Sequence, residues 1–490
     1  MIGWLTKARK RGCPLLAVQT PEPLGAVADI KQAMVGQHLL AWSWDCAAGP
    51  SALTEEAENA GAPDCGTEPD GMLAWAQSMP DNAVMVAHWH QEYWQDVRVR
   101  QGVINLRDTF KRSKRTLVLL GRQLTIPVSL RSDFLAYDVM LPGTQELESV
   151  ITSIEAYLPN KLTESERCAA IDALRGMTQF EAEQHAAMSY RATGEQCSET
   201  KGKIRIAELW KAKVRLINST PGLQCWQGSE SAEQVKGLDA LLSDFTAIKD
   251  GRLPVRLVVW IDESEDALAG VEGDTSGISQ DYLGTLAKHI QDTEAQSILL
   301  AGHPGTGKSL SAKCAGTVFG CLVLALDLGA CKGSLVGESE SNLRHALAIE
   351  RAIVGNQLGS TLWIWTTNNA EALPHKLRAR MQGEYFCDLP GEQESLAIWS
   401  LYRSKYAIPQ GDSFPACEGW TGREIARCCR LAWQYKRTLQ EASTRVVPIR
   451  ISQAKAIIER RNQASGRYLD AAQGGIFKWQ EQREGRKVEL

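Results

Sequence analysis

Two short stretches in the second half of the chain have residue types and spacings that could do chemistry. The first, "GHPGTGKS" at 302–309, fits the pattern G-x-x-x-x-G-K-[ST], follows the apolar run "SILLA" and precedes a helical pattern. Its glycines allow backbone N–H groups to turn toward phosphates at a helix N-terminus, where anions are favoured. Lys308 is expected to bridge the β- and γ-phosphates, and Ser309 to place its hydroxyl on Mg²⁺. The predicted nucleotide-binding residues of this loop are Gly302, Pro304, Gly305, Thr306, Gly307, Lys308, Ser309 and Leu310.

The second stretch, "LVVWIDE" at 257–263, is an apolar run that ends in two carboxylates. Asp262 is expected to hold the Mg²⁺ shell, and Glu263 to orient and deprotonate an attacking water. A buried strand followed by a solvated acidic turn is the alternative, but it would have to coincide with a phosphate loop in the same domain. The carboxylates precede the phosphate loop by about 40 residues, which is an unusual order.

Two further segments carry candidate catalytic residues. Asn368, at the end of "TLWIWTTNN" (361–369), could hydrogen-bond the γ-phosphate or the water. Arg378 and Arg380 precede the last apolar run, and a guanidinium supplied across a subunit boundary is worth roughly 10³ to 10⁵ in rate. A surface charge is an equally good interpretation of either arginine alone.

Apolar runs that alternate with helical patterns predict the elements that position these residues. Continuous apolar strands at this spacing are typical of a parallel sheet covered by helices. The runs lie at 14–20, 38–45, 82–89, 115–121 and 134–142 in the first half, and at 255–261, 297–301, 321–326, 361–365 and 384–388 in the second.

The two halves also share letters, which predicts two copies of one fold. The stretch 126–146 aligns with 373–394 through a Pro, a Leu-Arg pair, a strand that ends in Leu-Pro-Gly, and a Gln-Glu that opens a helix. The first copy has "TPEPLG" at 20–25 in place of a phosphate loop, and its third strand is followed by "HWHQE". Only the second copy is therefore expected to hydrolyse a nucleotide. His88 and His90 have no evident third ligand nearby and are interpreted as structural.

Composition narrows the class of protein. The chain has 490 residues, 44% of them hydrophobic and 23% charged, with a net charge of −4, as expected for a globular protein of two or three domains. No apolar segment is long enough to span a membrane, and neither the charge nor the short basic clusters predict a nucleic-acid footprint. The 13 cysteines form no C-x-x-C pair, which favours reduced thiols in the cytoplasm.

These residues together resemble the AAA+ ATPases, and more closely the poorly characterised AAA+ proteins encoded in plastids, cyanobacteria and some phages. The likeness is carried by "PGTGKSLSAK" (304–313), "VGESESNLR" (336–344), "WIDE" (260–263) and "SGISQDYLGTL" (276–286). It implies an α/β fold: a P-loop AAA+ parallel sheet with a helical lid, preceded by a degenerate AAA+-like domain. In "TGREI" (421–425), Arg423 matches the second-sensor position, which contacts the γ-phosphate.

The departure from the family is the order of the strands along the chain. The acidic strand and its helix precede the phosphate loop, so the unit is transposed, as in a circular permutation. With the family's sheet order of 5-1-4-3-2, this chain would visit strands 3, 1, 2, 4 and 5. Transposing a strand with its helix leaves the carboxyl ends of the strands, and so the site, in place.

The resemblance further implies an organisation and a function. We predict a degenerate, nucleotide-free domain at 1–200, a linker region at 201–235, the ATPase core at 236–390, a lid at 391–470 and a tail at 471–490. The expected protein binds ATP and Mg²⁺, forms a homo-oligomeric ring, which the resemblance implies to be a hexamer, and remodels an unknown protein client. A DNA-handling motor and a nucleotide-switched scaffold are the alternatives.

Leu335, Val336 and Gly337 stand where relatives that thread polypeptide carry an aromatic residue, which weakens a grip on polypeptide. The expected location is the cytoplasm, or a host's cytoplasm for a phage protein, without a membrane contact.

Overall fold

The protein is described by a computed structural model that divides into two compact units. The first unit contains residues 1–157 and 177–188, and the second contains 158–176 and 189–490. The structure describes residues 2–34, 38–122, 124–190, 202–228, 230–263, 278–331, 338–355, 357–369, 371, 373–416 and 418–479.

The first unit is a three-layer α/β sandwich around a sheet of order β3-β2-β4-β5-β1-β6. Every pairing is parallel except that of β3 with β2. Side chains alternate along the buried strands: Leu15 and Ala17 of β1 face one apolar cluster, and Leu16 and Val18 face the other. The strands are β1 (Leu15–Gln19), β2 (Ala41–Asp45), β3 (Gly49–Ala52), β4 (Val84–His88), β5 (Thr116–Gly121) and β6 (Leu135–Asp138).

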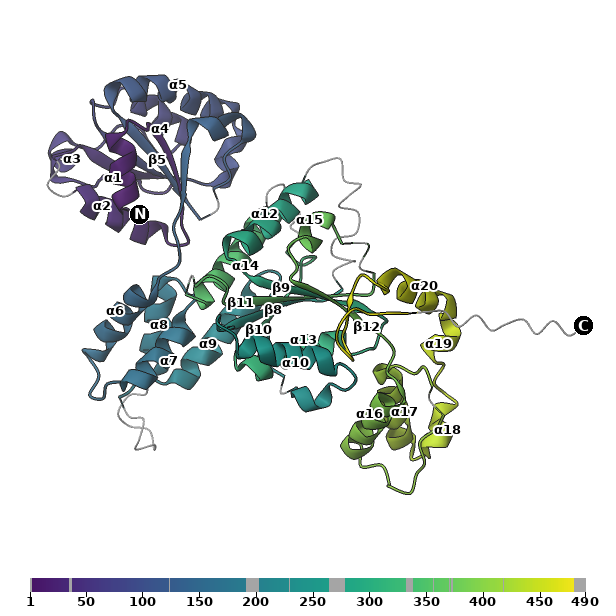
Figure 1. Ribbon diagram of the computed structural model, residues 1–490. Helices are drawn as coiled ribbons and strands as arrows, with labels where there is room; N and C mark the ends of the chain where they lie inside the picture. The colour runs from purple at the N-terminus through teal and green to yellow at the C-terminus, as the bar shows by residue number, and fades with distance from the viewer. Residues whose placement is uncertain are drawn as a thin grey trace, which may run out of the picture. The chain divides into compact units, whose positions relative to one another are not determined.

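Helices cover both faces of this sheet (Figure 1). Buried residues of α1 and α2 belong to one cluster, and those of α4 and α5 belong to the other. Two further helices of this unit, α6 and α8, follow the last strand along the chain. The helices are α1 (Ile2–Lys10), α2 (Pro23–Met34), α3 (Glu55–Ala60), α4 (Pro69–Ala76), α5 (Val97–Ser113), α6 (Thr144–Glu155) and α8 (Gln179–Ser189).

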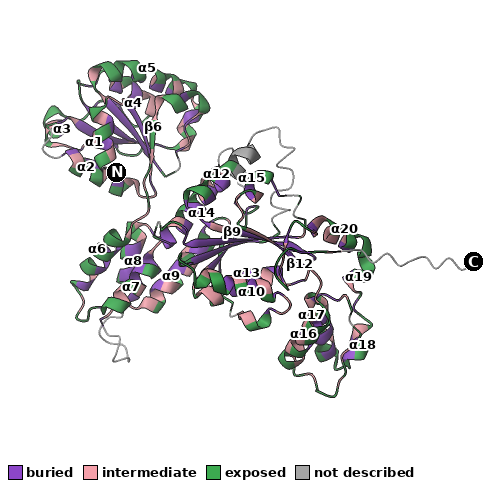
Figure 2. Ribbon diagram, viewed as in Figure 1, coloured by how far each residue is buried: buried purple, intermediate pink, exposed green. Residues whose placement is uncertain are grey.

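The second unit contains a seven-stranded sheet of order β13-β12-β9-β11-β8-β10-β7, antiparallel only between β7 and β10. Its central strands β8, β9 and β11 are almost wholly buried (Figure 2). The strands are β7 (Leu223–Trp226), β8 (Leu257–Ile261), β9 (Gln296–Gly302), β10 (Leu322–Leu326), β11 (Thr361–Thr367), β12 (Gly383–Cys387) and β13 (Leu469–Asp470).

The predicted rearranged strand order is confirmed. Numbered as in the family, the central strands β12-β9-β11-β8-β10 read 5-1-4-3-2, although β8 comes first in the chain. The first unit has the same order, because β6-β1-β5-β4-β2 also reads 5-1-4-3-2, here without any transposition. Each sheet ends with an antiparallel strand beside its second strand. The two halves therefore share one sheet plan, as the sequence repeat predicts.

Helices enclose the second sheet, with α10 and α13 on one face and α12 and α14 on the other (Figure 1). The lid follows β12, and its core joins α16, α17 and α18 through Trp399, Ile425 and Leu439. The helices are α7 (Glu164–Leu174), α9 (Ile206–Ser219), α10 (Asp239–Lys249), α12 (Ile278–Asp292), α13 (Lys308–Phe319), α14 (Glu338–Ile353), α15 (His375–Arg378), α16 (Glu392–Lys405), α17 (Gly422–Tyr435), α18 (Leu439–Ser443), α19 (Ile449–Ser452) and α20 (Ala454–Ala464).

Two predicted boundaries differ from the structure. Residues 201–235, expected to be a linker region around a short helix at 204–217, contain that helix as α9 and also the strand β7, and both belong to the second unit. Helix α9 buries Leu209 and Ile217, and β7 completes the edge of the sheet beside β10. A short edge strand in a polar segment has no apolar run of its own, so the sequence pattern suggested a linker.

The end of the chain also differs from the predicted lid and tail. After the lid, the chain returns to the second sheet, where β13 pairs with β12. Phe477, in the predicted tail, is buried with its ring 4.7 Å from the ring of Phe386. A two-residue strand carries no periodic signal, and only the contacts with β12 reveal it.

Among the described residues, no helix is both long and apolar enough to cross a membrane.

Candidate functional site

Three adjacent strands of the second sheet end in the predicted site residues. The phosphate loop follows β9, Asp262 follows β8, and Asn368 follows β11. Because β9, β11 and β8 are neighbouring parallel strands, their carboxyl ends lie at one edge of the sheet. The topology therefore brings together residues that are up to about 100 positions apart in the chain.

The phosphate loop makes close backbone approaches that only glycine permits. A Cβ on Gly302 would lie 2.2 Å from the carbonyl oxygen of Cys387, at the end of β12. Gly305 has φ +84°, and a Cβ there would lie 2.8 Å from Cβ of Arg423 in the lid. Helix α13 begins at Lys308, directly after Gly307, so its N-terminus faces the loop.

Lys308 is buried and joins the loop to the end of β11. Its Nζ donates to the carbonyl oxygens of Gly302 at 3.0 Å and His303 at 2.7 Å, and to Oδ1 of Asn368 at 3.0 Å. A phosphate that binds here would accept hydrogen bonds from this ammonium group in place of some of its present acceptors. The contact with Asn368 places the predicted sensor residue beside the predicted phosphate-binding lysine.

The predicted metal ligands lie side by side. Ser309 Oγ donates to Asp262 Oδ1 at 2.8 Å, as expected if the acidic strand belongs to the same sheet as the phosphate loop. A hydroxyl and a carboxylate are oxygen ligands of the kind that Mg²⁺ uses, with substrate phosphates and waters completing the shell. The pair therefore fits Mg²⁺. Asp262 also accepts a hydrogen bond from Thr366 Oγ1 on β11.

A cavity of about 330 Å³ contains these groups and is closed on one side by the lid. The backbone N–H of Arg423 donates to the carbonyl oxygen of Gly305 at 3.2 Å, which holds α17 against the phosphate loop. Glu263 also lines the cavity, with a left-handed φ of 45°. Of the predicted residues, Asp262, Glu263, Pro304, Gly305, Thr306, Gly307, Lys308, Ser309, Leu310, Asn368 and Arg423 line the cavity.

Three predicted residues do not line it. Gly302 lies beneath the loop, against β12. Arg378 forms an ion pair with Glu384 and donates to the hydroxyl of Tyr468 at 3.0 Å. Arg380 donates to Oε1 of Gln291 at 3.1 Å and to a nearby backbone carbonyl. The structure therefore does not bring either arginine to the site of its own chain.

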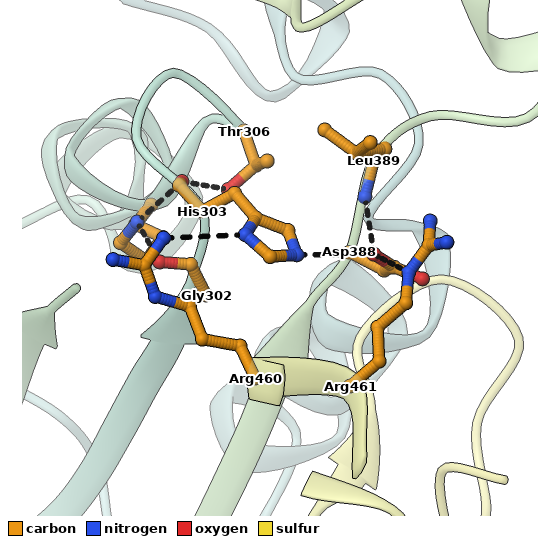
Figure 3. Close-up of polar contacts among 8 residues, drawn as sticks. Gly302, His303, Thr306, Asp388, Leu389, Arg460 and Arg461 are labelled. Carbon is orange, nitrogen blue, oxygen red and sulfur yellow. Dashed lines mark hydrogen bonds and ion pairs between the residues drawn. The ribbon is translucent and has the colours of Figure 1, made fainter. Parts of the chain in front are cut away.

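Several residues of the site have no signal in the sequence. Thr366 lies within a buried apolar strand, and His303 occupies a variable position of the loop motif. Asp388 lines the cavity and contacts His303 and Arg461, two residues far from it in the chain (Figure 3). Burial raises the pKa of Asp388, but its contacts with His303 and Arg461 outweigh this effect and hold that pKa below its usual range. The segment 234–237, ahead of α10, also lines the cavity.

Some predicted features lie outside the described residues. These are the segment after Glu263, residues 264–277, and the segment 332–337 with Leu335, Val336 and Gly337. His88 ends β4 in the first unit, where burial lowers its pKa. Among the described residues, no group of three or more His, Cys, Asp or Glu side chains is arranged to hold a metal ion.

Comparisons with known proteins agree with the fold and the motifs. Residues 5–139 match the family model "SpoVK-like AAA ATPase, N-terminal domain". Residues 298–354 match the model "ATPase family associated with various cellular activities (AAA)". The second match begins in β9 and ends in the segment after α14, so it covers the phosphate loop.

The chain is similar to two curated proteins, each named "Uncharacterized AAA domain-containing protein ycf46". That of Trieres chinensis is 22% identical over 353 residues, which are 64% of this chain and 63% of that protein. That of Guillardia theta is 22% identical over 428 residues, which are 76% of each chain. The chain thus spans less than two thirds of the Trieres protein.

Among solved structures, the "Crystal structure of FIGL-1 AAA domain" has a TM-score of 0.32 and 15% identity, and the match covers 51% of this chain and 94% of that one. The motifs, the shared sheet order and the sequence matches agree: the second unit carries an AAA+ ATPase domain, and the first unit is similar to the N-terminal domain of SpoVK-like AAA ATPases.

Proposed function

We propose that this protein hydrolyses ATP in the cavity at the carboxyl edge of its second sheet. The observation that carries the proposal is the meeting of Lys308, Ser309, Asp262 and Asn368, from three adjacent strands and the phosphate loop, beneath Arg423 of the lid. Phosphoryl transfer needs mainly positioning and charge stabilisation, and this set provides both.

Each residue has a distinct task in this proposal. Lys308 exchanges its present acceptors for phosphate oxygens, and Arg423 contacts the γ-phosphate from the lid. Ser309 and Asp262 hold Mg²⁺, which would neutralise charge on the β- and γ-phosphates when bound. Glu263 orients the attacking water and accepts its proton, and Asn368 hydrogen-bonds the water or the γ-phosphate.

The matched variants Lys308→Ala and Glu263→Gln test this function. We expect wild type to turn over ATP, Lys308→Ala to lose ATP binding, and Glu263→Gln to bind ATP with near wild-type affinity while turnover falls at least 100-fold. Phosphate release and equilibrium binding measure the two effects. Equally slow turnover in wild type and Glu263→Gln would contradict a hydrolase and leave a nucleotide-switched scaffold.

A ring is proposed because neither of the two predicted arginine fingers, Arg378 and Arg380, lies at the site of its own chain. Arg378 is occupied by Glu384 and Tyr468, whereas Arg380 holds only neutral acceptors in the described part of the chain, so Arg380 is the better candidate for a neighbour's site. The family implies a hexamer. Normal ATP turnover by a monomeric form of the protein would contradict this assembly.

The first unit is proposed to be a degenerate copy that serves assembly or docking. In the turn after β1, the carboxylate of Glu22 accepts the backbone N–H of Phe180 at 2.7 Å, at the start of α8. A carboxylate at this place repels phosphate and instead fixes a helix of the same unit. The two sheets then represent an unpermuted copy and a circularly permuted copy of one plan.

The work done by hydrolysis is proposed to be the remodelling of a protein client in the cytoplasm. Affinity capture with Glu263→Gln in the presence of ATP tests this, because an ATP-trapped ring should retain its client. Capture of the same proteins by Lys308→Ala would argue against nucleotide-dependent binding. ATP turnover that rises with single- or double-stranded DNA would instead favour a DNA-handling motor.

A further inference from the structure

A group of four ionisable side chains lies at the base of the phosphate loop and has no part in the proposed chemistry (Figure 3). His303 is the second residue of the loop and is 0% exposed. Asp388 follows β12 and lines the nucleotide cavity. Arg460 and Arg461 are consecutive residues of α20, the helix through which the chain returns from the lid to the sheet.

One neutral tautomer of His303 suits both of its neighbours, although at 3.5 Å the contact of Nε2 with Asp388 is longer than a hydrogen bond. Nδ1 lies 3.5 Å from Nη1 of Arg460, and Nε2 lies 3.5 Å from Oδ1 of Asp388. A guanidinium can only donate, so Nδ1 must accept and Nε2 must carry the proton that faces Asp388. Protonation of Nδ1 would direct a second positive charge at Arg460.

The carboxylate in this group is firmly held. Oδ1 of Asp388 accepts from Nε of Arg461 at 2.9 Å and from the backbone N–H of Leu389 at 2.8 Å. The guanidinium of Arg461 also lies 4.4 Å from the ring centroid of Trp479. The imidazole therefore contacts an acceptor whose position is fixed by the returning end of the chain.

The main chain of His303 anchors the phosphate loop itself. Its carbonyl oxygen accepts from Nζ of Lys308 at 2.7 Å and from Oγ1 of Thr306 at 2.8 Å. The same residue thus contacts α20 through its side chain and the phosphate-binding lysine through its carbonyl. A shift of the imidazole would move an acceptor of Lys308.

We infer that His303 is a positioning residue for nucleotide binding, which fixes the phosphate loop to Asp388 and, through Arg460, to helix α20. The chain beyond the lid is then part of the nucleotide-binding unit rather than a passive tail. This inference rests on the proposed ATP site and adds to it a residue that does not touch the nucleotide.

Protonation of His303 should make the affinity for ATP depend on pH. The charged groups that face the imidazole are Asp388, Arg460 and Arg461. Burial lowers the pKa of His303, Asp388 opposes this effect, and both arginines lower that pKa further. The neutral form is therefore intact at and above pH 6.5, and the contact with Arg460 is lost as pH falls through the lowered pKa. ATP affinity should therefore fall as the pH drops below this lowered pKa, which lies on the acid side of the ordinary value for histidine.

The test measures ATP affinity of the full-length protein by titration calorimetry between pH 5.5 and 8. We expect His303→Ala to raise the Kd for ATP at pH 7.5 about fivefold, the size of one hydrogen bond, with a smaller change in kcat. His303→Gln, which retains an amide donor and acceptor but cannot titrate, should stay within about twofold of wild type and lose the acid-side decline.

Variants of α20 separate this role from a general loss of packing. Arg460→Ala should weaken ATP binding by a similar factor. The double variant with His303→Ala should bind little more weakly than either single variant, because both substitutions remove the same contact. Lys455→Ala, an exposed residue of the same helix, is the matched control and should bind as wild type does. If His303→Ala fails to fold, His303→Gln and Arg460→Ala decide the outcome.

Failure of this inference differs from failure of the proposed function. If His303→Ala and Arg460→Ala both bind ATP with wild-type affinity at every pH, this inference is wrong and the proposed ATP site is unaffected. If wild type and Lys308→Ala both fail to bind ATP, the proposed function itself is wrong.

Discussion

The carboxylate that is predicted to hold Mg²⁺ accepts hydrogen bonds from two hydroxyl groups, one in the phosphate loop and one on a neighbouring strand. Asp262 accepts hydrogen bonds from Ser309 and from Thr366, and Thr366 is 1% exposed. Ser309 is the proposed ligand, whereas the hydroxyl of Thr366 is buried between β11 and β8, where it also lies 3.4 Å from the carbonyl oxygen of Ile261. We therefore expect the hydroxyl of Thr366 to orient the carboxylate of Asp262 at the proposed Mg²⁺ site.

Replacing Thr366 tests this role at the residue scale. Thr366→Val removes one hydrogen bond to Asp262 at nearly constant volume, so the Mg²⁺ concentration for half-maximal ATP turnover should rise about fivefold. Thr366→Ser keeps the hydroxyl and should remain close to wild type. Titrating Mg²⁺ at saturating ATP measures the effect, and equal half-saturation in wild type and Thr366→Val would show that the hydroxyl does not orient the carboxylate.

At the scale of elements, the lid contacts the phosphate loop backbone to backbone. The backbone N–H of Arg423 donates to the carbonyl oxygen of Gly305. A side chain on Gly305 would collide with Arg423. Helix α17 begins with a capping box in which Thr421 and Glu424 bond each other's backbone N–H groups. The capping box therefore sets where α17 begins, and the hydrogen bond to Gly305 sets where α17 lies against the phosphate loop.

A methyl group at Gly305 should separate these two elements. In Gly305→Ala the new Cβ would lie 2.8 Å from Cβ of Arg423, so the lid must move and ATP affinity should fall at least tenfold. Gly320→Ala is the matched control, because Gly320 also has a positive φ, of +68°, but nothing lies within 4 Å of its Cβ position. That control should lose about 1 kcal/mol of stability and keep its ATP affinity. Equal affinity in both variants would mean that the lid contact is unimportant for binding.

At the scale of the whole molecule, two sheets of one plan differ in their phosphate-binding turns. The loop of the second unit presents Lys308 and Ser309 at the start of α13. The corresponding turn of the first unit presents Glu22, and that carboxylate already accepts a hydrogen bond from α8. We therefore expect the full chain to contain one nucleotide site, although it contains two copies of the sheet.

Binding stoichiometry tests the single site. Wild type should bind one ATP per chain at saturation, and Lys308→Ala should bind none, because the only proposed site loses its phosphate-binding ammonium group. Equilibrium dialysis with labelled ATP measures both numbers. A Lys308→Ala protein that retains one bound ATP per chain would assign a working site to the first unit. Glu22→Ala should leave the stoichiometry of wild type unchanged, since it supplies no phosphate-binding donor.

The sequence by itself determined the local parts of this protein. Apolar runs fixed ten of the strands, because buried parallel strands are apolar throughout, and the loop motif identified Lys308 and Ser309 through its spacing alone. The repeat of 126–146 in 373–394 predicted the shared plan of the two sheets. The short strands β3, β7 and β13 gave no usable pattern.

Only the tertiary structure decided which distant residues meet. Thr366 beside Asp262, and His303 between Asp388 and Arg460, depend on contacts between strands and helices that lie far apart in the chain. It also showed that Arg378 is held by Glu384, which a motif cannot reveal. Local sequence encodes strand, helix and loop through periodicity and backbone preference, whereas a polar contact across the fold is encoded only by the packing that brings its two partners together.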